Sequence, residues 1–247
     1  MITKKELEDY ARFRNIKNSG HAEKDYFQNI ILFILSQHYG NNMIFKGGTA
    51  LNKCYGLDRF SEDLDFTCKE KIDPVYIEED LKRFKTAFTI TKEENKNSLK
   101  IILHIQGPLY AGIKNSMCRL VIDMSLRETI VLQPTIKTIG RFLEEIPSFD
   151  ILVMNENEIF AEKIRAIMTR NKARDLYDLL FLINRGIKFN KELTEEKLKF
   201  YEKKWNKNQF EQAIAEKKNI WESELKPLIS HVPDFKKISH EIIEYIT

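Results

Sequence analysis

The chain has 247 residues, of which 43% are hydrophobic and 31% are charged, and its formal net charge is +3. This length fits one large globular domain or two small ones, either of which would fold without disulfides or a structural metal. The small net charge does not by itself indicate nucleic-acid binding, and the absence of any run of about 18 uninterrupted apolar residues predicts no membrane-spanning helix.

The N-terminus and the cysteines favour a cytoplasmic protein. The chain is polar from Thr3 onward, so we expect no apolar signal segment. Cys54, Cys68 and Cys118 are widely spaced and form no Cys-x-x-Cys pair, which argues against a disulfide framework or a zinc cluster. A reducing cytoplasm is therefore the expected compartment.

The first 40 or so residues have helical periodicity, with apolar residues from Tyr26 to Leu35 at helical spacing and a stop at Gly40. The short apolar run Met43–Phe45 then leads through two glycines into a helix predicted to begin near Thr49 and to continue to Tyr55. A loop and a strand follow up to Thr67.

Further along, Asp73-Pro74 predicts the start of a helix that reaches about Phe84. Strands are predicted at Phe88–Thr91, Leu99–Ile105 and Cys118–Leu126, with glycines and a proline marking the turn before the last of them.

From about residue 156 the chain is rich in Lys, Glu, Leu and Ile and poor in Gly, which indicates helices. Asn155 and Glu158 resemble a capping box, and apolar stripes run from Phe160 to Met168 and from Leu176 to Ile183. We therefore predict an α+β domain over residues 1–154 and a helical domain over residues 155–247.

Two acids one pleat apart are the most informative feature. In a strand through Asp63-Leu64-Asp65-Phe66-Thr67, Asp63, Asp65 and Thr67 share one face while Leu64 and Phe66 point into a core. Carboxylates roughly 7 Å apart along such a strand can bracket magnesium, which prefers a few carboxylates together with phosphate oxygens. The alternative is a solvated strand edge that carries two acids.

Asp123 strengthens the metal interpretation. It lies in the apolar strand Arg119–Ser125, where an acid needs a partner or a metal. A third carboxylate on a neighbouring strand would complete a two-metal site for phosphoryl transfer. An edge position that faces water is the alternative.

Lys46-Gly47-Gly48-Thr49 lies upstream of the acids. Paired glycines between a strand and a helix let phosphates approach backbone N–H groups, and Thr49 adds a hydroxyl. The spacing is neither that of a Walker A loop nor that of a dinucleotide fingerprint, and many such pairs are only turns.

A basic helical face follows in the C-terminal part. Lys163, Arg170 and Arg174 are spaced to share one side, and such a cluster suits a triphosphate or an RNA backbone. Asp175 and Asp178 are one helical turn apart, and an Arg174–Asp178 pair at i,i+4 would make this stretch only a salt-bridged surface.

These motifs, in this order, resemble those of the AbiEii/AbiGii toxin family of nucleotidyltransferases. The resemblance rests on Phe45–Leu51, on Arg59–Phe66, and on the later runs Glu158–Ala166 and Arg170–Leu179, and with Asp123 it spans residues 43–185. It implies a polymerase-β-like nucleotidyltransferase core, a mixed sheet with flanking helices, plus a C-terminal helical domain.

The resemblance also implies the roles of individual residues. Asp63, Asp65 and Asp123 would hold Mg²⁺, with Mn²⁺ as an alternative, and Lys163 and Asp175 would complete the catalytic set. The nucleotide-binding residues would be Lys46, Gly47, Gly48, Thr49, Ser61 and Lys163.

The expected function is magnesium-dependent transfer of NMP from an NTP to an acceptor, expected to be RNA such as the tRNA 3′ end. In the resembled family the enzyme is the toxin of a toxin–antitoxin or phage-defence system, so an antitoxin encoded by an adjacent gene is an expected partner. The alternatives are NMP transfer to a protein hydroxyl, a glycosyltransferase that uses Asp-x-Asp, and a non-catalytic module that binds RNA or an antitoxin.

Overall fold

The computed structural model describes residues 2–127, 129–140 and 146–246. The chain forms two compact units, each built from three segments. We call the first the sheet unit; it comprises Met1–Ala50, Glu62–Arg127 and Ile136–Val153. We call the second the helical unit; it comprises Leu51–Ser61, Glu128–Thr135 and Met154–Thr247.

A seven-stranded mixed sheet, with the strand order β3-β4-β5-β2-β1-β7-β6, forms the first unit's framework. β2 pairs antiparallel to β1 and parallel to β5, while β7 pairs parallel to β1. The strands are β1 Met43–Lys46, β2 Leu64–Cys68, β3 Phe88–Asn95, β4 Ser98–Ile105, β5 Cys118–Ser125, β6 Thr135–Ile139 and β7 Phe149–Val153.

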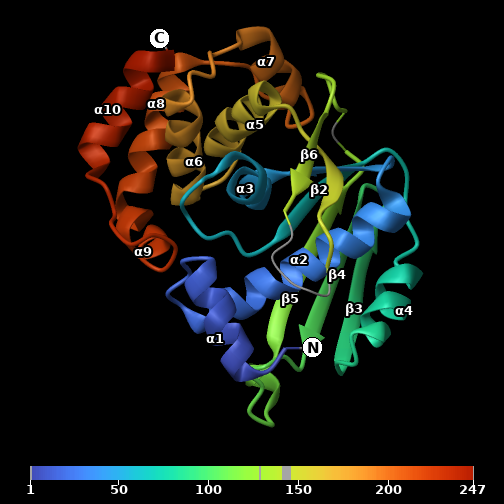
Figure 1. Cartoon of the computed structure of the whole chain (residues 1–247). Helices are drawn as coiled ribbons and strands as arrows, with labels where there is room; N and C mark the ends of the chain where they lie inside the picture. The colour runs from blue at the N-terminus through green and yellow to red at the C-terminus, as the bar shows by residue number, and fades with distance from the viewer. Residues whose placement is uncertain (1, 128, 141–145, 247) are drawn as a thin grey trace. The chain divides into compact units, whose positions relative to one another are not determined.

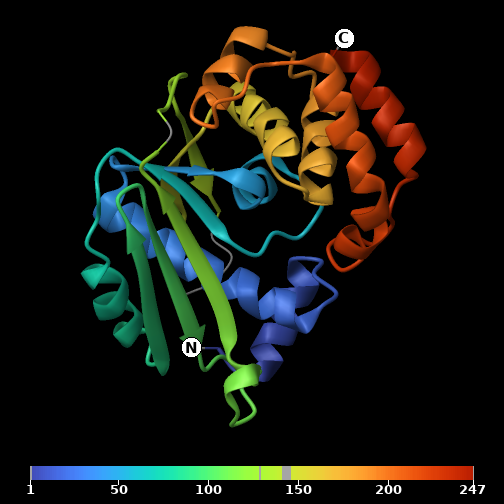
Figure 2. The same ribbon diagram turned by 180° about the vertical axis from the view of Figure 1, so that it is seen from behind.

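One face of this sheet is covered by α2, which lies across the strands and contacts β5 and β7 (Figure 1). Viewed from behind, the strands lie in front of α2 (Figure 2). The other helices of the sheet unit are short, and α3 follows β1 directly. The bounds are α1 Lys4–Phe13, α2 Ser19–Tyr39, α3 Gly47–Ala50 and α4 Val75–Arg83.

Strand alternation separates an apolar face from a polar face. Leu64, Phe66 and Ile122 are at most 1% exposed and belong to the core. Asp65 and Asp123, the intervening residues, are half-buried and lie on the other face because successive side chains of a strand alternate. This is the arrangement that the sequence predicted for these two acids.

The helical unit is organised around α5 and α6, which pack on each other. α7 and α8 pack on α5, while α9 and α10 pack on α6. The bounds are α5 Glu156–Thr169, α6 Ala173–Asn184, α7 Lys191–Lys199, α8 Lys207–Glu216, α9 Trp221–Leu225 and α10 Phe235–Ile246, with a π-helical turn at Leu51–Tyr55 and a short 3-10 turn at Lys217–Ile220. A further 3-10 turn, Lys114–Ser116, belongs to the sheet unit. Among the described residues no helix is long and apolar enough to cross a membrane.

Two segments of the predicted N-terminal domain, residues 1–154, belong instead to the helical unit. Residues 129–135 are held there by Glu158, whose carboxylate accepts the N–H groups of Val131 and Leu132 at 2.9 and 2.8 Å. The second segment, Leu51–Ser61, is held by an arginine described below. A single boundary in the sequence could not reveal this, because both attachments join residues far apart in the chain.

Glu158 also corrects the predicted capping box. The Asn155 side chain does accept the N–H of Asn157 at the start of α5, but Glu158 is fully buried and pairs with Lys197 instead of reaching back to Asn155. β6 and β7 were not predicted at all. β7 ends one residue before the last residue of the predicted N-terminal domain, Met154.

Candidate active site

Three of the predicted site residues form a row across the sheet unit. Asp65 on β2 lies in register with Lys46 on β1 and with Asp123 on β5. Adjacent strands are about 4.8 Å apart, so residues in register are direct neighbours on one face. The row continues to Lys100 on β4, which is in register with Asp123.

The order of charges along this row is Lys46, Asp65, Asp123 and Lys100. Two acids at facing positions repel each other unless cations or a metal offset their charge. A lysine at each end offsets part of it. Lys100 was not predicted as a site residue, because nothing in the sequence fixes the register of β4 on β5.

Gly47, in the turn that follows β1, lies directly beside Asp65. It has φ +75°, and a Cβ placed there would lie 2.5 Å from Asp65 Oδ2. Glycine is therefore needed both for the left-handed backbone and for the space that the carboxylate occupies. The Asp65 carboxylate therefore lies directly against the glycine turn.

Thr49 and Asp63 are joined through the backbone. The Thr49 hydroxyl is buried and donates to the Asp63 carbonyl at 2.5 Å. On the other side, the Gln28 amide donates to the Glu62 carbonyl at 3.0 Å. Asp63 precedes the first residue of β2, so these two hydrogen bonds, rather than strand pairing, fix the backbone that carries it.

The residues described by the structure include no group of three or more His, Cys, Asp or Glu side chains arranged to hold a metal ion. The donor chemistry of Asp65 and Asp123 nevertheless fits Mg²⁺. Both are half-buried carboxylates in register on neighbouring strands. Mg²⁺ is usually bound by one or two carboxylates, with water and substrate phosphate oxygens as its remaining ligands.

A second set of charged residues lies inside the helical unit. Lys163 on α5 is within 3.0 Å of Asp175 and 2.6 Å of Asp178, both on α6. Arg59 donates to both carboxylate oxygens of Asp178, at 2.5 and 2.7 Å. Arg170 donates to both oxygens of Asp175, at 2.7 and 2.8 Å. We call this set the ionic chain: Arg59–Asp178–Lys163–Asp175–Arg170.

The acids of the ionic chain are buried, and the neighbouring cations keep them charged. Asp175 and Asp178 are fully buried and the Arg59 side chain is 2% exposed. Burial acts to raise the pKa of Asp175, but the nearby Lys163 and Arg170 cations outweigh it and hold that pKa well below its usual range. For Asp178, likewise, Arg59 and Lys163 outweigh burial and lower the pKa. Both acids are therefore charged.

These contacts argue against the alternative in which Arg174 and Asp178 form a surface pair. Asp178 faces the interior, where Lys163 and Arg59 bind it. Asp178 and Arg59 are residues that the predicted site did not include. The spacing of Asp175 and Asp178 gave a signal for one of them, whereas the pairing of Arg59 with a residue 119 positions away gave none.

Ser61 is half-buried and ends the segment Leu51–Ser61. The preceding residue, Phe60, donates its N–H to the Leu228 carbonyl at 3.0 Å. Arg59 and Phe60 thus fasten this segment within the helical unit. The predicted site residues Ser61, Lys163 and Asp175 belong to that unit, while the other predicted residues belong to the sheet unit.

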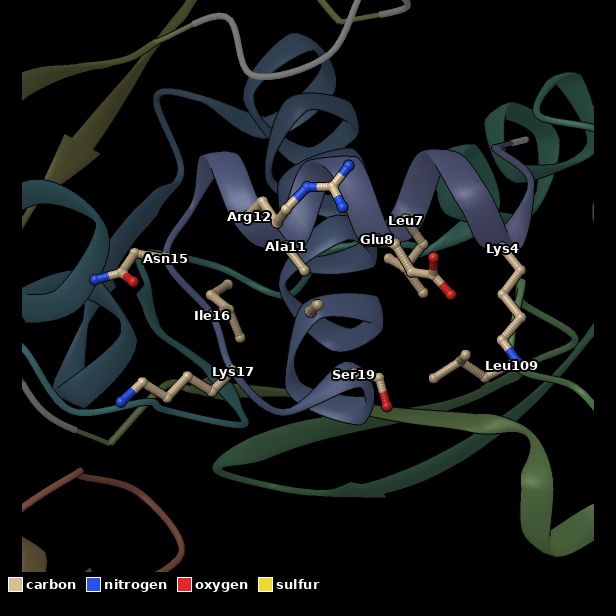
Figure 3. Close-up of a pocket in the computed structure, with 11 residues that line it drawn as sticks. Lys4, Leu7, Glu8, Ala11, Arg12, Asn15, Ile16, Lys17, Ser19 and Leu109 are labelled. Atoms are coloured by element: carbon tan, nitrogen blue, oxygen red, sulfur yellow. The ribbon is translucent and has the colours of Figure 1, made fainter.

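A separate pocket of about 700 Å³ lies in the sheet unit, between α1, the start of α2 and Leu109 (Figure 3). Its lining includes Lys4, Arg12 and Lys17 and one acid, Glu8. It contains none of the predicted site residues, so it is not the candidate active site.

Residues 30–241 match the family described as "Nucleotidyl transferase AbiEii toxin, Type IV TA system". The fold resembles MenT4, the nucleotidyltransferase toxin Rv2826c from Mycobacterium tuberculosis H37Rv, with a TM-score of 0.68 and 20% identity over 100% of this chain and 89% of that chain. It also resembles JHP933 from Helicobacter pylori, with a TM-score of 0.63 and 21% identity over 92% of this chain and 90% of that chain. No curated protein matches the sequence significantly.

Proposed function

Because the chain belongs to the AbiEii family of nucleotidyltransferase toxins, we propose that it transfers NMP from an NTP to an RNA acceptor, such as the 3′ end of tRNA. Asp65 and Asp123 would bind the Mg²⁺ on which this reaction depends. The observation that carries this proposal is the in-register pair Asp65 and Asp123, of which Asp65 lies beside Gly47. An antitoxin is the partner that we propose for the toxin.

Asp65 and Asp123, with Asp63 as a further carboxylate, would hold Mg²⁺. Bound Mg²⁺ would neutralise charge on the phosphate oxygens and lower the barrier to phosphoryl transfer. In the reaction the acceptor hydroxyl oxygen forms a bond to the α-phosphorus, and the bond from the α-phosphorus to the bridging oxygen breaks, which releases pyrophosphate.

The residues of the chain have distinct parts in this step. We assign to Asp123 the role of accepting the proton of the acceptor hydroxyl, because it lies beside Asp65 and is half-buried. Gly47 and Gly48 at the start of α3 offer backbone N–H groups to the triphosphate, helped by Lys46. The Thr49 hydroxyl holds the Asp63 backbone in place.

We also propose catalytic roles for Lys163 and Asp175, which form an ion pair inside the helical unit. Asp175 has the Lys163 cation at 3.0 Å, which helps to lower the pKa of its carboxyl group and keeps it ionised. Fixed charges of this kind stabilise charge that develops in a transition state without having to reorganise.

Label transfer tests the proposal. The protein is incubated with each α-labelled NTP, Mg²⁺ and total tRNA, beside Asp65→Asn and Asp123→Asn variants of equal volume. We expect label at the RNA 3′ end with wild type and a loss on the order of 1,000-fold or more with either variant. Label in protein instead of RNA would assign a protein hydroxyl as the acceptor, and wild-type transfer no greater than that of the variants would refute the proposal.

A toxicity assay separates catalysis from simple binding. Expression of wild type is expected to arrest growth and expression of an Asp63→Ala/Asp65→Ala variant is not. Toxicity retained by that variant would favour a non-catalytic module that binds RNA or an antitoxin.

A further inference from the structure

The order of strands in the sheet unit sets the side from which an acceptor reaches the proposed site. The proposed triphosphate ligands, Lys46 and Gly47, lie at the end of β1, and the strands beyond β1 are first β2 with Asp65 and then β5 with Asp123. In phosphoryl transfer the attacking and leaving oxygens lie roughly in line through the phosphorus. Pyrophosphate that leaves toward β1 therefore requires an acceptor hydroxyl that approaches over β5 and β4.

The face of β4 and β5 that carries Asp123 is open to solvent. In β4, half-buried residues from Ser98 to His104 alternate with buried ones. Lys100, one of the half-buried residues, is in register with Asp123, so these residues share a face with the acid. Arg119, four residues before Asp123 on β5, is exposed on the same face. An acceptor can therefore reach Asp123 along this surface.

Arg119 begins a row of residues that suits a nucleic-acid strand. His104 on β4 is in register with Arg119, and Thr89 on β3 is in register with His104. The arginine fork matches phosphate oxygens, and an imidazole ring can stack on an unpaired base. Glu93, the acid of β3 on this face, lies instead in the row of Lys100, so it does not weaken the positive charge at this row.

An apolar row separates Arg119 from Asp123. Val121 on β5 is in register with Ile102 on β4, and both lie on the open face. Apolar side chains of this kind can pack against the flat face of an unpaired base. At about 3.3 Å per residue, Arg119 and Asp123 are about 13 Å apart along β5. That distance corresponds to about four nucleotides of a stacked strand.

We propose that the open face of β5 and β4 binds the single-stranded 3′ end of the RNA acceptor, with the 3′ hydroxyl at Asp123 and with Arg119 on a backbone phosphate about four nucleotides upstream. His104 stacks on a base beside that phosphate. This inference rests on the proposed function and names the surface that binds the acceptor. It favours RNA over a protein hydroxyl, because a protein acceptor has no phosphate backbone for Arg119.

Acceptor length tests the proposal. Label transfer is measured with an RNA octanucleotide, which reaches Arg119, and with a dinucleotide, which does not. A charge-assisted hydrogen bond contributes about tenfold or more in affinity. We expect Arg119→Ala to raise the KM for the octanucleotide about tenfold. The KM for NTP, the kcat, and the kcat/KM for the dinucleotide should each change by less than about threefold.

His104 provides a second, independent variant. Loss of a stacked base contact costs about 1–3 kcal/mol, so His104→Ala should raise the KM for the octanucleotide about fivefold or more. His104→Phe keeps an aromatic ring and should restore most of the affinity.

Binding without turnover separates this inference from the proposed function. The octanucleotide carries a fluorophore at its 5′ end, and its binding is followed by fluorescence anisotropy without NTP. Arg119→Ala should raise the Kd about tenfold and reduce the slope of binding against salt concentration by about one phosphate contact.

Arg83→Ala is the matched control. Arg83 lies on α4 of the same unit, is 77% exposed and pairs with Asp80 at 2.8 Å. Its removal takes away an equal charge outside the proposed path, so the KM and Kd for the octanucleotide should stay within about twofold of wild type.

No binding of the octanucleotide by wild type, an unchanged Kd in Arg119→Ala, an equal loss with the dinucleotide, or an equal loss in Arg83→Ala would each overturn the proposal. Wild type that binds the octanucleotide in an Arg119-dependent way but transfers no label would refute the proposed function and leave this inference standing. Label transfer to RNA that does not depend on Arg119 would do the reverse.

Discussion

Gly47→Ala tests the contact between the glycine turn after β1 and the Asp65 carboxylate. The new Cβ would lie 2.5 Å from Asp65 Oδ2, whereas ordinary van der Waals contact begins at 3.4 Å, so the carboxylate must shift by about 0.9 Å. A displacement of about 1 Å in a catalytic group can cost on the order of 100-fold in rate. We therefore expect a loss of that size in label transfer.

Gly56→Ala is the control for backbone strain. Gly56 has φ +86°, and nothing lies within 4 Å of a Cβ built there. Both substitutions impose a left-handed conformation on alanine, which costs about 1–2 kcal/mol. Only Gly47→Ala also moves a carboxylate, so thermal melts should show similar losses of stability while transfer falls in Gly47→Ala alone. Equal transfer rates in the two variants would refute this reasoning.

Three further outcomes are expected. In urea unfolding, Asp178→Asn should lower the free energy of unfolding by about 3–5 kcal/mol because it leaves Arg59 buried without its carboxylate partner. Arg59→Met should lower the free energy of unfolding by less. The reverse order of the two variants would contradict the pairing. Thr49→Val should cost about 1 kcal/mol by removing the hydrogen bond to the Asp63 carbonyl, which a melt within error of wild type would rule out. The lowered pKa of Asp175 stabilises the folded state above its unfolded value of about 3.9, so the stability difference between wild type and Asp175→Asn should narrow as pH falls below about 4, and a constant difference would contradict it.

The elements with strong periodicity could be predicted from the sequence. The stop at Gly40, the strands from residue 88 to 125 and the stripes of α5 and α6 follow from apolar spacing and glycine placement. β7 was missed because it is only five residues long and its sequence alternates only weakly between apolar and polar residues. Its pairing with β1 also joins distant parts of the chain. β6 is equally short.

The aromatic residues of the C-terminal part divide between core and surface. Phe210 and Trp221 are 1% and 2% exposed, as expected for core residues, whereas Phe200 is 48% exposed. Trp205 packs against Phe189 and Phe210, with ring centroids 4.9 and 5.2 Å apart. Burial in the core therefore accounts for Phe210 and Trp221, and ring packing accounts for Trp205.

Some features of the candidate site could be predicted from the sequence and others could not. Strand alternation was enough to predict that Asp65 and Asp123 point away from the apolar core side of their strands. The Arg59–Asp178 pair, the Glu158 attachments and the register that brings Lys100 beside Asp123 all join distant parts of the chain. Periodicity carries no information on such contacts, so they could not be predicted without the fold.

Metal binding tests the central claim most directly. Mn²⁺ binding is followed by EPR, with and without a non-hydrolysable NTP, for wild type, Asp65→Asn, Asp123→Asn and Asp150→Asn. Asp150, a carboxylate on β7 that accepts from Thr138 at 2.6 Å, is the matched control outside the row. We predict that Asp65→Asn and Asp123→Asn weaken Mn²⁺ binding at least about tenfold while Asp150→Asn does not, and equal affinity in all four proteins would contradict the account.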